Sequence, residues 1–322
     1  MKTSAIIRVV CWVVIACVLV GVLVWGIGRG TGFSFNFLPV SCVEHGLKGL
    51  NEIGALPGDE GPYSQNNDYS VELGSIDTVN IAWVDGSVRV TPYDGDTIAF
   101  SESSVGGIPE KYALRYAVNG STLTIHYCES GINWNTAWWN LGKKLEVLVP
   151  KALANSFFGL EIDAVSSSTY VSGLSGDKMH LVTVSGSVGV ESVTANTLEI
   201  DTTSGSVSAA ACTVDAVQVD SVSGSIRLEG SFRSVSTDSV SASANITSAI
   251  CPSTVKMNTV SGMSTLIIPE NSGFTARHDS VSGGFSCVFP ATSSNDKAIY
   301  GDGSASFSFN SISGGIRIEK NG

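Results

Sequence analysis

Apolar and polar residues alternate through the second half of the chain, in units that recur about every nineteen residues. Each unit contains a variant of the phrase Val-Ser-Gly. The serine of the phrase, or its counterpart, stands at positions 166, 185, 204, 223, 241, 261, 282 and 313. Alternation with a period of two is typical of β-strands, and the repeats contain no segment with helical spacing. A fixed period of this length predicts stacked supersecondary units in place of one globular core.

The apolar positions lie at even distances from the serine before the phrase and at odd distances after it. In one rung, for example, they stand six and four places before the serine, at Leu198 and Ile200, and three and five places after it, at Val207 and Ala209. This change requires a corner, where glycine tolerates backbone angles that other residues avoid. We therefore expect an all-β fold in which residues 151–322 form a parallel β-solenoid (β-helix) of about 19-residue rungs, of either hand. Each rung is expected to bury its apolar columns against the next rung of the sequence, about 4.8 Å away.

A column in which five of eight residues are aspartates stands three places before each serine. Its members are Asp163, Val182, Asp201, Asp220, Asp238, Asn258, Asp279 and Asn310. One interpretation is a solvated face that keeps the solenoid soluble and discourages edge pairing. The other is a carboxylate ladder for Ca²⁺, with Asp201, Asp220 and Asp238 as candidate ligands. The nonapeptide Gly/Asp repeat of calcium-binding solenoids is missing from the chain, which weighs against calcium.

The N-terminal segment predicts a membrane anchor. Residues 9–27 carry no charge and are long enough to cross a bilayer, and Lys2 and Arg8 precede them. We therefore expect a cytoplasmic tail over 1–8, a transmembrane helix over 9–28 and a C-terminal domain outside the cell membrane. A cleaved signal peptide, or a lipoprotein site at Cys17, are the alternatives. A Gly-, Pro- and Asn-rich extracellular tether is expected over 29–70.

Residues 71–150 are expected to form an irregular β segment that caps the solenoid. The dipeptide Asn119-Gly120 predicts a hairpin turn. A tryptophan-rich stretch follows in a predicted loop between strands. It contains Trp134, Trp138 and Trp139. These residues either cover the open end of the solenoid or form an aromatic contact patch for sugars or membrane.

Composition narrows the class of protein. The chain has 322 residues and a net charge of −11, which argues against a nucleic-acid partner. Its seven cysteines do not form a disulfide framework, because the total is odd and the spacing is irregular. Cys212, Cys251 and Cys287 are expected to be core thiols, and Cys42 with Cys128 is the one pair expected to be exposed.

The sequence contains no motif of a known catalytic site. We find no nucleophile elbow, P-loop, dinucleotide fingerprint or His-Glu-x-x-His motif. His278 replaces an apolar residue in a repeat column and is expected to be a packed core imidazole. The aspartate column does not resemble a glycosidase site, because that chemistry needs two carboxylates in unlike environments. We therefore expect a protein that is not an enzyme and has no cofactor.

Several segments together resemble a bacterial family of adhesin-like domains of unknown function. They are "GSTLTIHY", a Trp/Asn/Lys loop, "KKLEVLVPK", "GLEIDAVSSSTYV" and the serial "VSGSV" rungs, within about 71–318. The resemblance implies a parallel β-solenoid on a bacterial envelope protein, and some relatives are associated with envelope-stress systems. It provides no catalytic residues. The chain departs from the repeat at Ala242, which replaces glycine, and in "ATSSNDKAIYGDG", which predicts a loop before the last rung.

Two functions follow as expectations. The first is a membrane-anchored extracellular solenoid that acts as a binding or scaffold protein of the cell envelope, like an adhesin, with an envelope component or another protein as partner. The alternative is an envelope-stress sensor or regulator, which would need membrane partners because the predicted cytoplasmic tail has only eight residues. A polysaccharide-active enzyme ranks last.

Overall fold

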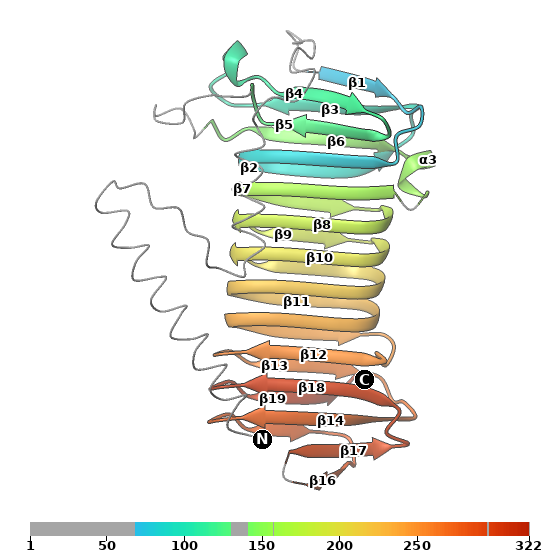
Figure 1. Ribbon diagram of the computed structural model, residues 1–322, viewed down its shortest axis with the longest axis vertical. Coiled ribbons are helices and arrows are strands. Elements are labelled where there is room, and N and C mark those ends of the chain that lie inside the picture. The colour runs from blue at the N-terminus through green and yellow to red at the C-terminus, as the bar shows by residue number, and fades with distance from the viewer. Residues whose placement is uncertain (1–67, 130–140, 157, 295, 322) are drawn as a thin grey trace, which may run out of the picture. The chain divides into compact units, whose positions relative to one another are not determined.

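The computed structural model describes residues 68–129, 141–156, 158–294 and 296–321, all within one compact unit. The regular secondary structure of this part is almost entirely β-strand, with one short 3₁₀ helix, η1 (Glu110–Tyr112), and one short α-helix, α3 (Lys151–Ala154) (Figure 1). The all-β prediction is therefore confirmed. None of the described helices is long and apolar enough to cross a bilayer. The expected tail, anchor and most of the tether lie outside the described residues.

Two parallel sheets are formed by stacked rungs, and each rung contributes a strand to both. In spatial order, the first sheet contains β5 (Thr122–His126), part of β2 (Thr78–Tyr93), part of β7 (Phe158–Ser172), β8 (Ser175–Ser185), β10 (Thr194–Ser204), two stretches of β11 (Val207–Ser248), β12 (Thr254–Thr259), β18 (Ala305–Ser311) and β14 (Gly273–Ser280). The second contains β6 (Lys144–Pro150), the rest of β2 and β7, β9 (Val188–Glu191), further stretches of β11, β13 (Ser264–Ile268), β19 (Ile316–Lys320) and β15 (Phe285–Cys287).

The apolar columns face inward on both sides of each corner, as the change of parity predicts. In the first sheet Ile200 lies in register with Leu181 and with Val219. In the second sheet Val207 lies in register with Val188. All of these side chains are buried. Complete burial of one such side chain stabilises the fold by about 1.5–3 kcal/mol, so the columns supply most of the stabilisation along the solenoid.

The last rung of the sequence does not lie at the end of the stack (Figure 1). β18 pairs with β12 on one side and with β14 on the other, and β19 lies likewise between β13 and β15. The expectation that each rung packs on the next in the sequence is wrong here. Phe307, Phe309, Ile316 and Ile318 of this rung are fully buried, whereas His278 of the preceding rung is only half-buried. The rung with the larger apolar side chains therefore occupies the interior.

The same inversion occurs at the other end. The rung made by β5 and β6 packs on β2, which also packs on β7, although β2 precedes both β5 and β6 in the chain. Antiparallel strands then cover both ends of the first sheet and the β6 end of the second. They are β4 (Arg115–Asn119) on β5, β3 (Thr97–Ser103) on β6, β1 (Asp68–Glu72) on β3, β17 (Lys297–Gly301) on β14, and β16 (Thr292–Ser294) on β17. These strands obstruct further parallel stacking.

Two local predictions have different outcomes. The hairpin at Asn119-Gly120 is confirmed, since β4 and β5 pair across it and Gly120 has a φ of 62°. The loop expected before the last rung is wrong, because that segment forms the β16–β17 hairpin. Ala298 of this hairpin is buried. The inserted segment therefore packs against the end of the stack as a hairpin.

Candidate functional site

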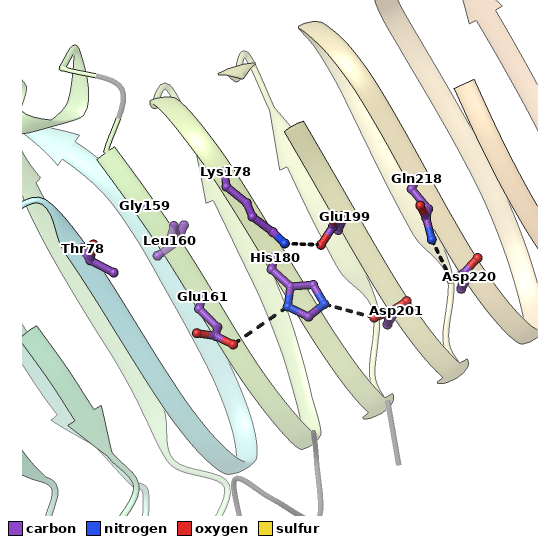
Figure 2. Close-up of a pocket in the computed structure, with 10 residues that line it drawn as sticks. All are labelled: Thr78, Gly159, Leu160, Glu161, Lys178, His180, Glu199, Asp201, Gln218 and Asp220. Carbon is purple, nitrogen blue, oxygen red and sulfur yellow. Dashed lines mark hydrogen bonds and ion pairs between the residues drawn. The ribbon is translucent and has the colours of Figure 1, made fainter. Parts of the chain in front are cut away.

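A trough of about 530 Å³ lies on the outward face of the first sheet, across β2, β7, β8, β10 and β11 (Figure 2). Ten residues line it. They are Thr78, Gly159, Leu160, Glu161, Lys178, His180, Glu199, Asp201, Gln218 and Asp220. Most of them come from alternate positions of neighbouring strands, because side chains two residues apart point to the same face of a strand.

A local irregularity coincides with the trough. Between β7 and β8 the register shifts, so that Phe158 pairs with Gly176 and Leu160 with Met179. β8 therefore has one residue more than β7 in this interval. Gly159, which lines the trough here, has no side chain to fill it. Bulges of this kind re-aim side chains and are common beside functional sites.

His180 lies between two carboxylates from the neighbouring rungs. Its Nε2 is 3.0 Å from Oδ2 of Asp201, and its Nδ1 is 3.9 Å from Oε1 of Glu161. Burial disfavours the charged imidazolium, but the hydrogen bonds to Asp201 and Glu161 outweigh it and raise the pKa of His180 to about 9. The imidazole is therefore charged at neutral pH and unavailable as a general base.

Two further pairs line the trough. Nζ of Lys178 lies 2.8 Å from Oε2 of Glu199, and Nε2 of Gln218 donates a hydrogen bond of 3.0 Å to Oδ2 of Asp220. Burial and the charges of Asp201 and Asp238 raise the pKa of Asp220 to about 6, against the effect of Gln218. Asp220 therefore changes charge close to neutral pH.

The aspartate column forms as the register predicts, but its members differ in environment. Asp201 is in register with Asp220 and is only 5% exposed, so it is not part of a solvated face. Asp238 accepts a hydrogen bond of 2.5 Å from Nδ2 of Asn258, and Nζ of Lys256 lies 3.7 Å from it. No group of three or more His, Cys, Asp or Glu side chains among the described residues is arranged to hold a metal ion. Calcium binding by Asp201, Asp220 and Asp238 therefore stays the alternative interpretation of the column.

One hydroxyl group lines the trough. Thr78 carries the only hydroxyl among its ten lining residues, and this hydroxyl donates a hydrogen bond of 2.8 Å to Oδ1 of Asp77. Nucleophilic catalysis needs a base held against the attacking hydroxyl. Asp77 does not line the trough. The other lining side chains offer mainly carboxylate, ammonium, imidazolium and amide groups, which can hydrogen-bond a ligand.

The predicted contact tryptophans and the cysteine predicted to be exposed have different outcomes. Trp134, Trp138 and Trp139 lie outside the described residues, and their contact role stays a prediction. The expectation that Cys128 is exposed is wrong, because it is buried next to Tyr127, and burial raises the pKa of its thiol to about 12.

Three further thiols lie in the part of the chain that the structure describes. Cys212 is buried as expected, and Cys251 and Cys287 are half-buried. Burial raises the pKa of all three thiols above the ordinary value. Thiolates are the reactive form of cysteine, so a raised pKa lowers the reactive fraction of each side chain at neutral pH.

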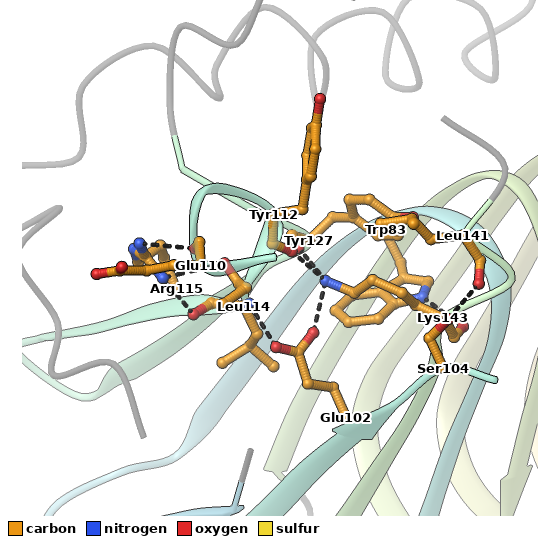
Figure 3. Close-up of polar contacts among 11 residues, drawn as sticks. Trp83, Glu102, Ser104, Glu110, Tyr112, Leu114, Arg115, Tyr127, Leu141 and Lys143 are labelled. Atoms are coloured by element: carbon orange, nitrogen blue, oxygen red, sulfur yellow. Dashed lines mark hydrogen bonds and ion pairs between the residues drawn. The ribbon is translucent and has the colours of Figure 1, made fainter. Parts of the chain in front are cut away.

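The structure adds a second polar cluster, at the end covered by β3 and β4 (Figure 3). Nζ of Lys143 lies 2.5 Å from Oε2 of Glu102, and both side chains are completely buried. The same Nζ donates hydrogen bonds to the carbonyl oxygens of Tyr112 and Tyr127, at 2.7 and 2.5 Å. Oε1 of Glu102 accepts a hydrogen bond of 2.7 Å from the amide of Leu114. Each partner is thus hydrogen-bonded within the fold.

Aromatic rings enclose this pair. Nζ of Lys143 lies 4.8 Å from the ring centroid of Trp83 and 4.1 Å from that of Tyr127. Burial lowers the pKa of Lys143, against the effect of Glu102. The sequence gives little sign of the pair, since the two residues are distant in the chain and only the start of "KKLEVLVPK" hints that one lysine is not outward.

Comparison with known proteins supports the fold. The family model Toastrack DUF4097 matches residues 70–319. A candidate lipid binding protein from Parabacteroides distasonis has 18% identity and a TM-score of 0.50, over 79% of this chain and 96% of its own. A candidate adhesin from Bacteroides fragilis has 15% identity and a TM-score of 0.43, over 81% and 99%. No curated protein matches the chain. At such identities the first likeness supports the fold alone.

Proposed function

The chain belongs to the Toastrack DUF4097 family, and from this premise we propose that it is a non-catalytic, adhesin-like binding protein of the cell envelope. The observation that carries the proposal is the outward trough. It spans five neighbouring strands and presents donors and acceptors that are already held in place by ion pairs or hydrogen bonds with one another. Such a surface can hydrogen-bond an extended polar ligand without reorganising its own charges.

The charge of the trough limits the class of ligand. Glu161, Glu199, Asp201 and Asp220 outnumber Lys178 and His180 among the lining residues. A negative excess repels polyanions and favours neutral or positively charged ligands. Among polymers of the envelope, this favours a neutral or amine-bearing saccharide over an anionic lipid or a phosphate-rich polymer.

The anchor belongs to the same proposal. The uncharged segment over 9–27, preceded by Lys2 and Arg8, supports one membrane span with the β domain outside. Membrane fractionation and protease treatment of intact cells test this arrangement. The expected result is a membrane-bound protein whose β domain is cut from outside, and a soluble protein or a protected domain contradicts it.

Sedimentation of the full chain with isolated cell-wall glycan tests the binding role. Lys178→Ala is expected to weaken binding at least about tenfold, because it removes a charged hydrogen-bond donor from the trough. Lys256→Ala is the matched control, since Lys256 lies on the same sheet, is 54% exposed against 58% for Lys178, and does not line the trough. Equal binding by both variants, or release of glycan fragments, contradicts the proposal.

A further inference from the structure

The pair formed by Lys143 and Glu102 has the burial and the contacts needed for covalent chemistry. Both side chains are completely buried, and Nζ lies 2.5 Å from Oε2. Burial disfavours the charged ammonium group and lowers the pKa of Lys143, so the neutral amine becomes more accessible. Nζ and Oε2 are in contact within this ion pair, so a proton can pass from the ammonium group to the carboxylate.

The surroundings orient the amine as a nucleophile. Two of its N–H groups are directed to the carbonyl oxygens of Tyr112 and Tyr127. When the third proton lies on Glu102, the lone pair of Nζ occupies the remaining direction, toward the carboxyl group. A neutral amine with a directed lone pair is the reactive form of lysine.

The surroundings also polarise the carboxyl group. The amide of Leu114 donates a hydrogen bond of 2.7 Å to Oε1 of Glu102. Negative charge develops on this oxygen when the amine attacks, and a fixed backbone donor stabilises it. The rings of Trp83 and Tyr127 wall the site and exclude the water that would compete.

We infer that Lys143 and Glu102 become joined by an intramolecular isopeptide bond. The proton passes from Nζ to Oε2, and Nζ then attacks Cδ of Glu102 to form the C–N bond. The C–Oε2 bond breaks, and Oε2 leaves as water with the proton it holds and a second proton from nitrogen. No oxidant, reductant or co-reactant is needed.

The fold provides the driving force. Groups held in contact react with effective concentrations of about 10⁵–10⁸ M, which favours condensation over hydrolysis. The amide is neutral, so the cost of burying two charges disappears. Its oxygen keeps the bond from Leu114, and its single N–H keeps one of the two tyrosine carbonyls. The bond would join β3 to the residue before β6 and constrain the unfolded chain as a disulfide does.

Peptide mapping by mass spectrometry tests the inference on the full chain. The expected result is a linked peptide pair containing Glu102 and Lys143, lighter than the sum of its parts by one water, and an intact mass reduced by the same amount. Lys151 and Asp94 form an exposed ion pair with Nζ 2.8 Å from Oδ1, so they are the internal control and remain unlinked.

Lys143→Met is the variant control, and its mass is expected to equal the calculated value. Because this variant can fail to fold, the decision rests on the natural chain. If the folded natural chain yields separate peptides for Glu102 and Lys143, the two residues form only an ion pair and the inference is overturned.

Discussion

A Cβ atom added to Gly205 would lie 1.9 Å from the carbonyl oxygen of Gly186 in the neighbouring rung, and one added to Gly224 would lie 2.2 Å from that of Gly205. At the scale of single residues, the repeat phrase therefore requires glycine because the backbones of neighbouring rungs pack too closely for a side chain. A serine hydroxyl three places before the glycine also stabilises the corner. Oγ of Ser311 accepts a hydrogen bond of 2.7 Å from the amide of Gly314. The repeat thus combines a serine that hydrogen-bonds the backbone of the corner with a glycine that leaves room for the next rung.

We predict that Gly205→Ala lowers the free energy of unfolding by about 1–3 kcal/mol, because the added methyl group forces neighbouring rungs apart. Urea unfolding followed by circular dichroism measures the loss. Gly284→Ala is the matched control, since a Cβ there meets no atom within 4 Å. Equal stabilities for the two variants would contradict the stacking argument.

From the raised pKa of His180 we predict that the protein loses stability in mild alkali. Its folded pKa of about 9 lies above its ordinary value of 6.5, so its contribution is complete below pH 6.5 and is lost as the pH rises through 9. The melting temperature of the natural protein is expected to fall between pH 6.5 and 9.5. His180→Asn should reduce this dependence. An unchanged pH profile in that variant would show that other groups cause it.

For Asp220 we predict a substitution that stabilises the protein at neutral pH. Its folded pKa of about 6 lies above the ordinary value of 3.8, so the folded state loses stability as the pH rises from 3.8 through 6. Asp220→Asn removes the buried charge and is expected to raise the melting temperature at pH 7 but not at pH 3.5. Calorimetry at the two pH values measures the difference. A lower melting temperature at pH 7 would contradict the assignment.

At the scale of elements, the order of rungs differs from the order of the chain at both ends. The last rung has parallel partners on two sides in both sheets. Among the described residues, the preceding rung has a parallel partner on one side, β18 for β14 and β19 for β15, and the other side of β14 is covered by the β16–β17 hairpin. Repeat stability depends on contacts with neighbouring rungs. The final rung is therefore held more firmly than the one that precedes it in the sequence.

Hydrogen exchange tests this order. Peptides from β18 are expected to exchange more slowly than peptides from β14. Phe309→Ala should destabilise the fold by about 3–5 kcal/mol and speed exchange in both β14 and β18, because Phe309 is fully buried between the neighbouring rungs. His278→Ala, in the end rung, should speed exchange mainly in β14. Faster exchange of β18 than of β14 in the natural protein would contradict the intercalated topology.

At the scale of the whole molecule, the acidic column and the net charge of −11 predict self-repulsion along the solenoid. Sodium chloride is expected to raise the melting temperature by screening the charges. Calcium chloride at the same ionic strength should add nothing, since the carboxylates of Asp201 and Asp238 already have protein partners. An additional rise with calcium would instead establish that the column binds the ion.

The sequence by itself determined the all-β fold, the repeat length, the inward columns and the hairpin at Asn119-Gly120. These features are local, since the alternation of side chains and the requirements of a corner or turn act within one rung. The aspartate column was equally predictable, because a constant spacing brings equivalent residues into register.

Only the tertiary structure decided which rungs are neighbours at the ends, and which polar groups meet. The choice between the last two rungs depends on how well Phe309 and His278 fill the interior, which alternation alone does not rank. His180 pairs with carboxylates from other rungs, and Glu102 meets Lys143 only because antiparallel strands fold over the end of the stack. Such contacts depend on strand order and register over long separations, and no local pattern encodes them.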